Sequence, residues 1–428
     1  MTYKEALEYI HSVTWKGSRP GLERITELCS RLGNPEDSLR FIHVAGTNGK
    51  GSTSRMISSI LEKSGYSVGL FTSPFIERFN ERIMLNGHDI PDEELARATE
   101  TVRVHADAME DSPTEFELIT AIALDYYKRV KCDYVVLECG LGGRLDSTNV
   151  IKTPVLSIIT GIDLDHTAIL GDTAAKIAAE KAGIIKPGVP VIFGEGCDEA
   201  EEVIRKTAEE QNSPYIRTDF SAITDVSSDL DGTAFKFGGK KVRINLHGLY
   251  QTRNTATVLT AVDVLRERGV SIPDEAVDQG LDAARWPARF EILSRTPLVI
   301  YDGAHNPQGI AGACENIAHY LSPMTDDGKI ALLMGVMADK DHDRMTAMLA
   351  PYAKKVFSVT PANERSLSAR GVGEEFSRFG IESESFDILS DGVASAVKFA
   401  ENKKIPLVCL GSLYMYADVK EAVRGAVI

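Results

Sequence analysis

The sequence has 428 residues, of which 43% are hydrophobic and 25% are charged, and its formal net charge is −15. This length exceeds what one compact core normally holds, so we expect two domains. The negative charge argues against nucleic acid as a general partner, and no apolar run reaches the roughly 18 residues that span a membrane. Since the first residues, MTYKEALEYI, also lack the apolar core of a signal peptide, we predict a cytoplasmic protein without a membrane partner.

Strands and helices alternate through the first half of the chain. The first 35 residues have the pattern of two amphipathic helices, and residues 40–45 form an apolar run typical of a strand. Further strand-like runs are YSVGLFTSP, residues 133–138, TPVLSIITGI and GVPVIFGEG, and helical patterns lie between them at 91–110 and 115–130. This alternation predicts a mostly parallel sheet that helices cover on both faces.

A different pattern separates the two halves. Residues 218–247 contain AFKFGGKKVRINL, which alternates with period two around a Gly-Gly turn and predicts an antiparallel hairpin on the first domain. A helix at about 251–268 follows, and then the strand–helix alternation restarts with PLVIYDG, KIALLMGVM, KKVFSVTP and IPLVCLGS. We therefore predict an α/β protein with two domains. Residues 1–293 would form a P-loop-type, mostly parallel sheet domain with a small antiparallel hairpin region, and residues 297–428 a smaller Rossmann-like α/β domain.

The segment FIHVAGTNGKGSTS, residues 41–54, has a glycine loop between a strand and a helix. Its spacing, G-x-x-G-K-G-S, is tighter than the usual phosphate-loop pattern, but strand, loop and helix have the required order. The helix N-terminus would bind phosphate, Lys50 would reach the β- and γ-phosphates, and the Ser52 hydroxyl would meet Mg²⁺. The alternative is a glycine-rich turn with an exposed lysine.

The segment ECGLGGRLDSTN follows the strand at 133–138. Glu138 is expected at the carboxyl end of that strand, where ligands of open α/β sheets bind, and a carboxylate there suits a hard cation. The alternative is a glutamate that caps the next loop. Its glycines Gly140, Gly142 and Gly143 indicate either a close backbone approach or a tight turn.

Two further candidates follow the third strand. DLDHTAILG contains His166, which could bind a metal, although a loop histidine is more often only a hydrogen-bonding residue. AAKIAAEKAGIIKPG, residues 174–188, predicts a helix ended by Pro-Gly. Its Lys181 lies among apolar residues, and the default interpretation is an ordinary exposed lysine.

The second half opens with YDGAHNPQG, residues 301–309. It places Asp302 and His305 at a strand end before a helix. The alternative is that these residues only form a turn.

Together these segments resemble the folylpolyglutamate synthase/dihydrofolate synthase family, within the Mur ligase superfamily. The resemblance covers nearly the whole chain and is carried by RPGLERI, FIHVAGTNGKGS, TSPFIERFNERI, LECGLGGRLDSTN, DHTAILGDTAAKIAAEKAGIIK, ARFEIL, YDGAHNP and GSLYMY.

The resemblance implies a role for each candidate. The residues that would contact ATP are Gly49, Lys50, Gly51, Ser52, Asn254, Arg289 and Asp302. Two Mg²⁺ ions would be bound by Ser52, Ser73, Glu138 and His166. The pterin-binding positions are Phe116, Leu145, Asp146 and Ser147, with helix core as the alternative role for Phe116.

The catalytic residues implied by the resemblance are Lys50, Lys181 and His305. Lys181 matches a lysine that the family converts to N6-carboxylysine, a modification that needs a neutral amine. His305 would orient the incoming amine. Three positions depart from the family pattern and bear on loop shape or substrate fit: Phe75, Tyr250 and Ala288.

We predict an ATP-dependent ligase that adds L-glutamate to dihydropteroate, to folate polyglutamates, or to both, through an acyl phosphate. The substrates are small molecules, and we expect a monomer. The alternatives are a cell-wall amino-acid ligase of the same superfamily and a nucleotide-binding regulator that ligates nothing.

Overall fold

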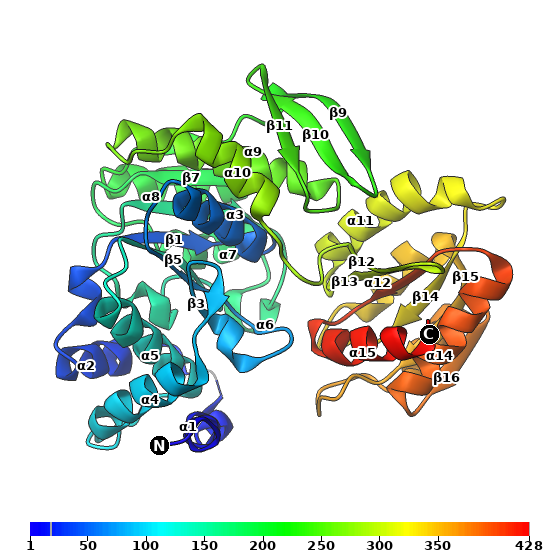
Figure 1. Cartoon of the computed structure of the whole chain (residues 1–428), viewed down its shortest axis with the longest axis horizontal. Coiled ribbons are helices and arrows are strands. Elements are labelled where there is room, and N and C mark those ends of the chain that lie inside the picture. Colours follow the sequence, from blue (N-terminus) through cyan, green and yellow to red (C-terminus); the bar gives the residue numbers. More distant parts are fainter. Residues whose placement is uncertain (18, 428) are drawn as a thin grey trace. The chain divides into compact units, whose positions relative to one another are not determined.

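The structure, a computed structural model, describes residues 1–17 and 19–427 and divides into two compact units (Figure 1). The first unit contains Met1–Thr224, Lys236–Arg243 and Arg253–Ala284. The second contains Asp225–Phe235, Ile244–Thr252 and Arg285–Ile428. None of the helices in the described residues is both long enough and apolar enough to cross a membrane.

The first unit is built on a sheet of eight strands, most of them parallel, as the sequence predicts. In spatial order the strands are β4 (His88–Asp89), β3 (Ile83–Leu85), β2 (Val68–Phe71), β5 (Tyr134–Glu138), β1 (Phe41–Ala45), β6 (Leu156–Gly161), β7 (Val191–Glu195) and β8 (Tyr215–Arg217). Neighbours in the series β2, β5, β1, β6, β7, β8 pair in parallel, and β3 and β4 extend the sheet antiparallel. The central strands are buried throughout, which explains their uninterrupted apolar runs.

Helices cover both faces of this sheet. Figure 1 shows α4 and α5 on one side of the strands and α9 and α10 on the other. The helices of this unit are α1 (Tyr3–His11), α2 (Glu23–Arg31), α3 (Lys50–Lys63), α4 (Asp92–Ala106), α5 (Glu115–Arg129), α6 (Thr167–Leu170), α7 (Ala174–Ala182), α8 (Asp198–Glu210), α9 (Tyr250–Glu267) and α10 (Asp274–Ala283). The first residues of α9, up to Thr252, belong to the second unit. Helices α1, α2, α4 and α5 share one core with strand residues such as Phe71 and Leu137.

Helix α7 is shorter than expected. The sequence predicts a helix that continues to the Pro-Gly pair at 187–188, whereas α7 ends at Ala182. A Cβ atom at Gly183 would lie 2.3 Å from the Arg144 Cα, so the chain turns where glycine permits a close approach to another segment.

The second unit has a six-stranded sheet. Its spatial order is β12 (Glu291–Arg295), β13 (Leu298–Asp302), β17 (Leu407–Leu410), β14 (Ile330–Met334), β15 (Ala353–Val359) and β16 (Ser383–Phe386). Only β12 pairs antiparallel. Its helices are α11 (Pro307–Asn316), α12 (His342–Leu349), α13 (Ala369–Ser377), α14 (Leu389–Lys403) and α15 (Tyr416–Ala426). The four strands predicted here are present, and the edge strands β12 and β16 were not predicted.

The predicted hairpin is part of a three-stranded sheet, β11 (Lys240–Ile244), β10 (Gly232–Phe237) and β9 (Ile223–Asp229). Its Gly-Gly turn lies where expected, and both glycines have positive φ, 55° at Gly238 and 82° at Gly239. Parts of this sheet belong to each unit, so it is not confined to the first domain. The domain bounds 1–293 and 297–428 remain a prediction.

Candidate active site

Four neighbouring strands of the first unit end at one edge of the sheet. The order β2, β5, β1, β6 is parallel throughout, and Val44 on β1 is level with Glu138 on β5. Because parallel strands present their carboxyl ends together, the segments that follow them meet at this edge. Those segments contain Ser73 after β2, Glu138 at the end of β5, the glycine loop after β1 and His166 after β6.

The glycine loop after β1 is fixed by hydrogen bonds to β6 and to its own lysine. The Thr160 hydroxyl donates to the Asn48 carbonyl oxygen at 2.6 Å. The Lys50 ammonium donates to the Gly46 and Thr47 carbonyl oxygens at 3.0 and 3.1 Å. Lys50 also begins α3, so the helix N-terminus, with its unpaired N–H groups and positive dipole end, opens directly from the loop.

Gly49 explains both the loop's geometry and the position of Asn254. It precedes α3 with a left-handed φ of 84°, which favours glycine. A Cβ atom there would lie 2.5 Å from the Asn254 Oδ1, so α9 brings Asn254 directly against the loop. Two predicted ATP contacts, distant in sequence, therefore lie side by side.

The predicted magnesium ligands have the right chemistry at this edge. Ser52 is 3% exposed and Glu138 is 4% exposed, so a hydroxyl and a carboxylate are both held out of solvent. Hard oxygen ligands of this kind suit Mg²⁺. His166 differs: it is exposed and has a left-handed φ of 50° at the start of α6. Ser73 is half-buried.

Lys181 is buried, with 3% exposure, so the interpretation as an ordinary exposed helix lysine is wrong. Burial, and after it the positive charge of Lys50, lower the pKa of Lys181 to about 7. A large fraction of the Lys181 amine is therefore neutral near pH 7. The backbone of α7 is held against the glycine loop after β5, because the Arg144 N–H donates to the Glu180 carbonyl at 2.7 Å.

The glycine loop after β5 lies against Phe116. A Cβ atom at Gly140 would lie 2.6 Å from the Phe116 ring, so the close approach requires glycine here. The ring is half-buried and lies 5.9 Å from the Phe71 ring. The Thr120 hydroxyl links this turn to the next loop: it donates to the Phe116 carbonyl at 2.8 Å and lies 3.0 Å from the Ser147 hydroxyl. This arrangement brings Phe116 and Ser147 together, with Leu145 half-buried in the same loop.

Asp146 is buried and closes this loop. Its carboxylate accepts hydrogen bonds from the Leu141 N–H at 2.8 Å and from the Thr148 N–H at 3.0 Å and hydroxyl at 2.5 Å. Burial raises the pKa of Asp146, and these hydrogen bonds lower it. The sequence analysis predicts that Asp146 binds the pterin, but part of its capacity to accept hydrogen bonds is used by the protein itself.

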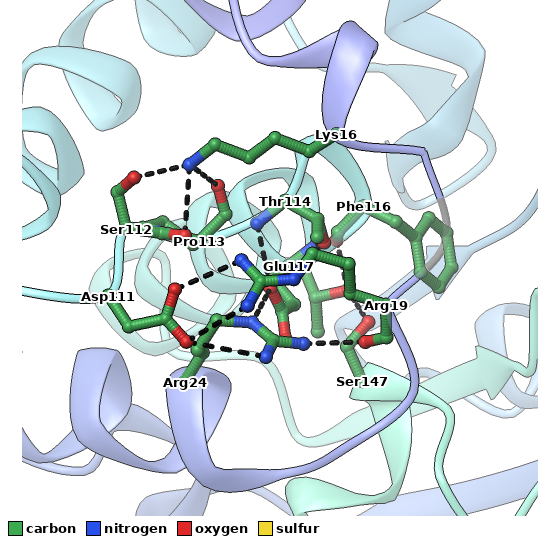
Figure 2. A network of polar contacts seen from close by, with 11 residues as sticks. Lys16, Arg19, Arg24, Asp111, Ser112, Pro113, Thr114, Phe116, Glu117 and Ser147 are labelled. Atoms are coloured by element: carbon green, nitrogen blue, oxygen red, sulfur yellow. Dashed lines mark hydrogen bonds and ion pairs between the residues drawn. The ribbon is translucent and has the colours of Figure 1, made fainter.

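A polar network beside Phe116 was not predicted from the sequence (Figure 2). Its centre is the ion pair between Arg24 and Glu117, whose Nε and Oε2 atoms are 3.0 Å apart. The available signals were the two arginines in RPGLERI and the capping-box spacing of TEFE. Neither signal identifies the two residues as partners.

In the second unit, Asp302 ends β13 and is 3% exposed. It accepts from the Tyr250 hydroxyl at 3.0 Å and from the Ala304 N–H at 2.9 Å. Burial raises its pKa to about 6, although the charge of Arg289 acts in the opposite direction. Asp302, Arg289 and Tyr250 thus form one electrostatic group.

The next residues complete this strand end. His305 Nδ1 donates to the Gly303 carbonyl at 2.8 Å, which fixes the proton on Nδ1. Ala288, where the family often has glycine, takes a left-handed φ of 56° and is fully buried. The departure therefore keeps the backbone conformation that glycine would adopt without strain.

Comparisons with known proteins agree with this geometry. Residues 44–262 match the Mur ligase middle domain, and residues 288–413 match the Mur ligase, glutamate ligase domain. Over 438 aligned residues, the chain is 37% identical to the dihydrofolate synthase/folylpolyglutamate synthase of Bacillus subtilis (strain 168), with 99% of each chain covered.

The chain belongs to the folylpolyglutamate synthase/dihydrofolate synthase family of Mur ligases. Its fold matches that of E. coli FolC in complex with DHPP and ADP, with a TM-score of 0.86, 29% identity and coverage of 100% and 99% of the two chains. It also matches an FPGS–AMPPCP–folate complex, with a TM-score of 0.83, 34% identity and coverage of 99% and 100%. The predicted family, the α/β fold class and the ATP-dependent ligase class are confirmed.

Proposed function

We propose that this member of the folylpolyglutamate synthase/dihydrofolate synthase family adds L-glutamate to dihydropteroate, to folate polyglutamates, or to both. ATP would phosphorylate the acceptor carboxylate, giving an acyl phosphate and ADP. The glutamate amine would then attack the acyl carbon, release phosphate and form the amide. Phosphoryl transfer of this kind depends mainly on positioning and charge stabilisation.

One observation carries the proposal: two adjacent strands lead into two loops of different chemistry. Strand β1 leads into the glycine loop with Lys50, and β5 leads into the loop that contains Gly140, against which the Phe116 ring lies. The loop offers backbone donors and Lys50 for phosphates, while Phe116 offers an aromatic face for a flat heterocycle. A nucleotide and a pteridine carboxylate would thus be bound as neighbours.

We assign the remaining roles as follows. Gly49, Lys50, Gly51, Ser52 and Asn254 bind the nucleotide, and Leu145, Asp146 and Ser147 complete the pterin site around Phe116. Ser52 and Glu138 would hold Mg²⁺, with Ser73 and His166 as further ligands, and the ion would supply positive charge to the phosphates. From the second unit, Arg289 and Asp302 bind the nucleotide, and His305 orients the glutamate amine.

We also propose that Lys181 becomes N6-carboxylysine. Its neutral amine would attack CO₂, form the N–C bond of a carbamate and release one proton. The product replaces an ammonium beside Lys50 with an anion, which removes the repulsion between the two charges. The lowered pKa of Lys181, to about 7, supports this step because only the neutral amine reacts.

The test offers each acceptor separately with labelled L-glutamate and Mg-ATP, and it scores ADP, phosphate and the labelled product. We expect ADP only when glutamate and a pteridine acceptor are both present. ADP release without an acceptor would instead support a nucleotide-hydrolysing regulator. Labelling of a cell-wall precursor would support the other superfamily activity. A monomeric state and a cytoplasmic location remain predictions.

A further inference from the structure

Arg24 and Glu117 are a buried ion pair outside the residues assigned above. Arg24 is 7% exposed and Glu117 is 3% exposed, and their Nε and Oε2 atoms are 3.0 Å apart. Removing two charges from water is costly, and an apolar pair of similar volume is often equally stable. The pair is therefore a weak explanation of the stability of the folded protein. Its contacts with other residues indicate a second role.

Glu117 fixes the first turn of α5. Its Oε2 accepts from the Thr114 N–H at 2.7 Å and from the Thr114 hydroxyl at 2.9 Å, which is one half of a capping box. The same oxygen binds Arg24. Phe116 immediately precedes Glu117 in that turn. The carboxylate that binds Arg24 therefore also fixes the position of the Phe116 backbone.

The other nitrogens of Arg24 contact two more segments, as Figure 2 shows. One Nη donates to the Arg19 carbonyl oxygen at 2.5 Å, and the other lies 3.6 Å from the Asp111 carboxylate. The Arg19 side chain also pairs with Asp111 at 3.0 Å. Lys16 donates to the Pro113 carbonyl at 3.3 Å. Lys16, Arg19 and Arg24 are thereby fastened to residues 111–117, with Arg24 as the buried centre.

We propose that Arg24 is a positioning residue for the pterin site. Through Glu117 it sets the Phe116 ring against Gly140, and through the Arg19 carbonyl it holds the N-terminal segment beside the same turn. A guanidinium suits this task because its planar set of N–H donors addresses three acceptors in fixed directions, whereas a lysine ammonium or an apolar side chain does not. The inference rests on the proposed function in one respect, the assignment of Phe116 to the substrate heterocycle.

The main test uses Arg24→Lys and the double variant Arg24→Met/Glu117→Gln. The double variant removes both charges, while the glutamine can still accept from Thr114. We expect both proteins to melt within a few degrees of the wild type. We expect KM for dihydropteroate to rise at least about tenfold while kcat and KM for ATP change less than about threefold. A matched control is Arg31→Lys on the same helix, because Arg31 pairs with Glu27 at 2.7 Å on the surface. The control should change none of these values.

A purely structural role gives a different result. In that case the double variant, once folded, would bind dihydropteroate normally, or KM for ATP would rise as much as KM for dihydropteroate. Either outcome would overturn the proposal, as would full activity of Arg24→Lys. Phe116→Ala, measured alongside, separates this inference from the proposed function. If it raises KM for dihydropteroate and the Arg24 variants do not, only the positioning role fails. If Phe116→Ala has no effect on KM, the assigned pterin site fails and the inference fails with it.

Discussion

In each unit, one strand inside the sheet ends near a charged group, and the two groups have opposite charges. In the first unit, β1 leads into a glycine loop with backbone N–H donors, the start of α3 and Lys50. In the second, β13 ends in Asp302, a buried carboxylate with a pKa of about 6. Both strands are followed by a loop and a helix. The same architecture can thus present either a positive cradle or a carboxylate, and the loop residues decide which one.

The difference lies in how each group is compensated. Lys50 donates to the carbonyls of its own loop, and a phosphate could take these contacts over. Asp302 is held by Tyr250 and the Ala304 N–H, contacts within its own unit. The first strand end therefore has donors that an incoming anion could take over, and the second holds one carboxylate in place.

The largest effect should follow from removing the cation of the first strand end. Lys50→Ala should lower kcat by about 10²–10³-fold, since one charge facing the transferring phosphoryl group is lost. The melting temperature should change little, because a half-buried loop lysine contributes little to the core. Single-turnover ADP formation and a thermal melt measure both. A folded variant with near-normal turnover would contradict the phosphate-loop assignment.

Substitutions of Lys181 test whether the end of β1, with the positive charge of Lys50, also needs an anion beside it. Lys181→Ala should lose about 100-fold in kcat, and added acetate or formate should recover part of the activity by replacing the missing oxygens. Lys181→Arg should be equally impaired, because arginine cannot form a carbamate and stays charged. Intact mass and carbonate-free assays report the modification. Only free lysine by mass, together with a fully active Lys181→Arg, would exclude the carbamate.

Much of the fold, and part of the two strand ends compared above, could be predicted from the sequence. The buried parallel strands were recognisable as uninterrupted apolar runs, and the glycine loop between β1 and α3 was recognisable because its strand, glycines, lysine and helix are contiguous. The burial of Lys181 was not predicted, since an alanine-rich helix does not reveal which face meets another loop. The pairs Arg24–Glu117 and Tyr250–Asp302 were missed because each joins residues that only the folded chain brings together. The edge strands β12 and β16 were missed because none of their residues is fully buried, so neither strand forms an uninterrupted apolar run.

Asp302 provides the pH dependence of the second strand end. Its pKa is about 6 in the folded protein, above the value of 3.8 for the unfolded chain. The folded state therefore binds the proton more tightly, so stability falls as pH rises from about 4 through 6. Asp302→Asn removes this penalty, and its stability relative to the wild type should increase by roughly 2–3 kcal/mol between pH 4 and pH 7. Urea unfolding at several pH values measures the difference. A pH-independent difference would show that Asp302 titrates normally.

The smallest effect should come from Tyr250, whose hydroxyl donates to Asp302 at 3.0 Å. Tyr250→Phe keeps the ring and removes the donor, so it should cost ~1–2 kcal/mol at pH 7, where the carboxylate is charged. The hydrogen bond lowers the pKa of Asp302, and its loss should move the pH midpoint of the Asp302 effect upward. The decisive control is the same substitution in Asp302→Asn, where the cost should fall by at least half. An equal cost in both backgrounds would mean that Tyr250 stabilises the unit through ring packing. Backbone hydrogen bonds from Ala304 and Phe290 and the charge of Arg289 would then hold the carboxylate, and the contrast between the two strand ends would be weaker.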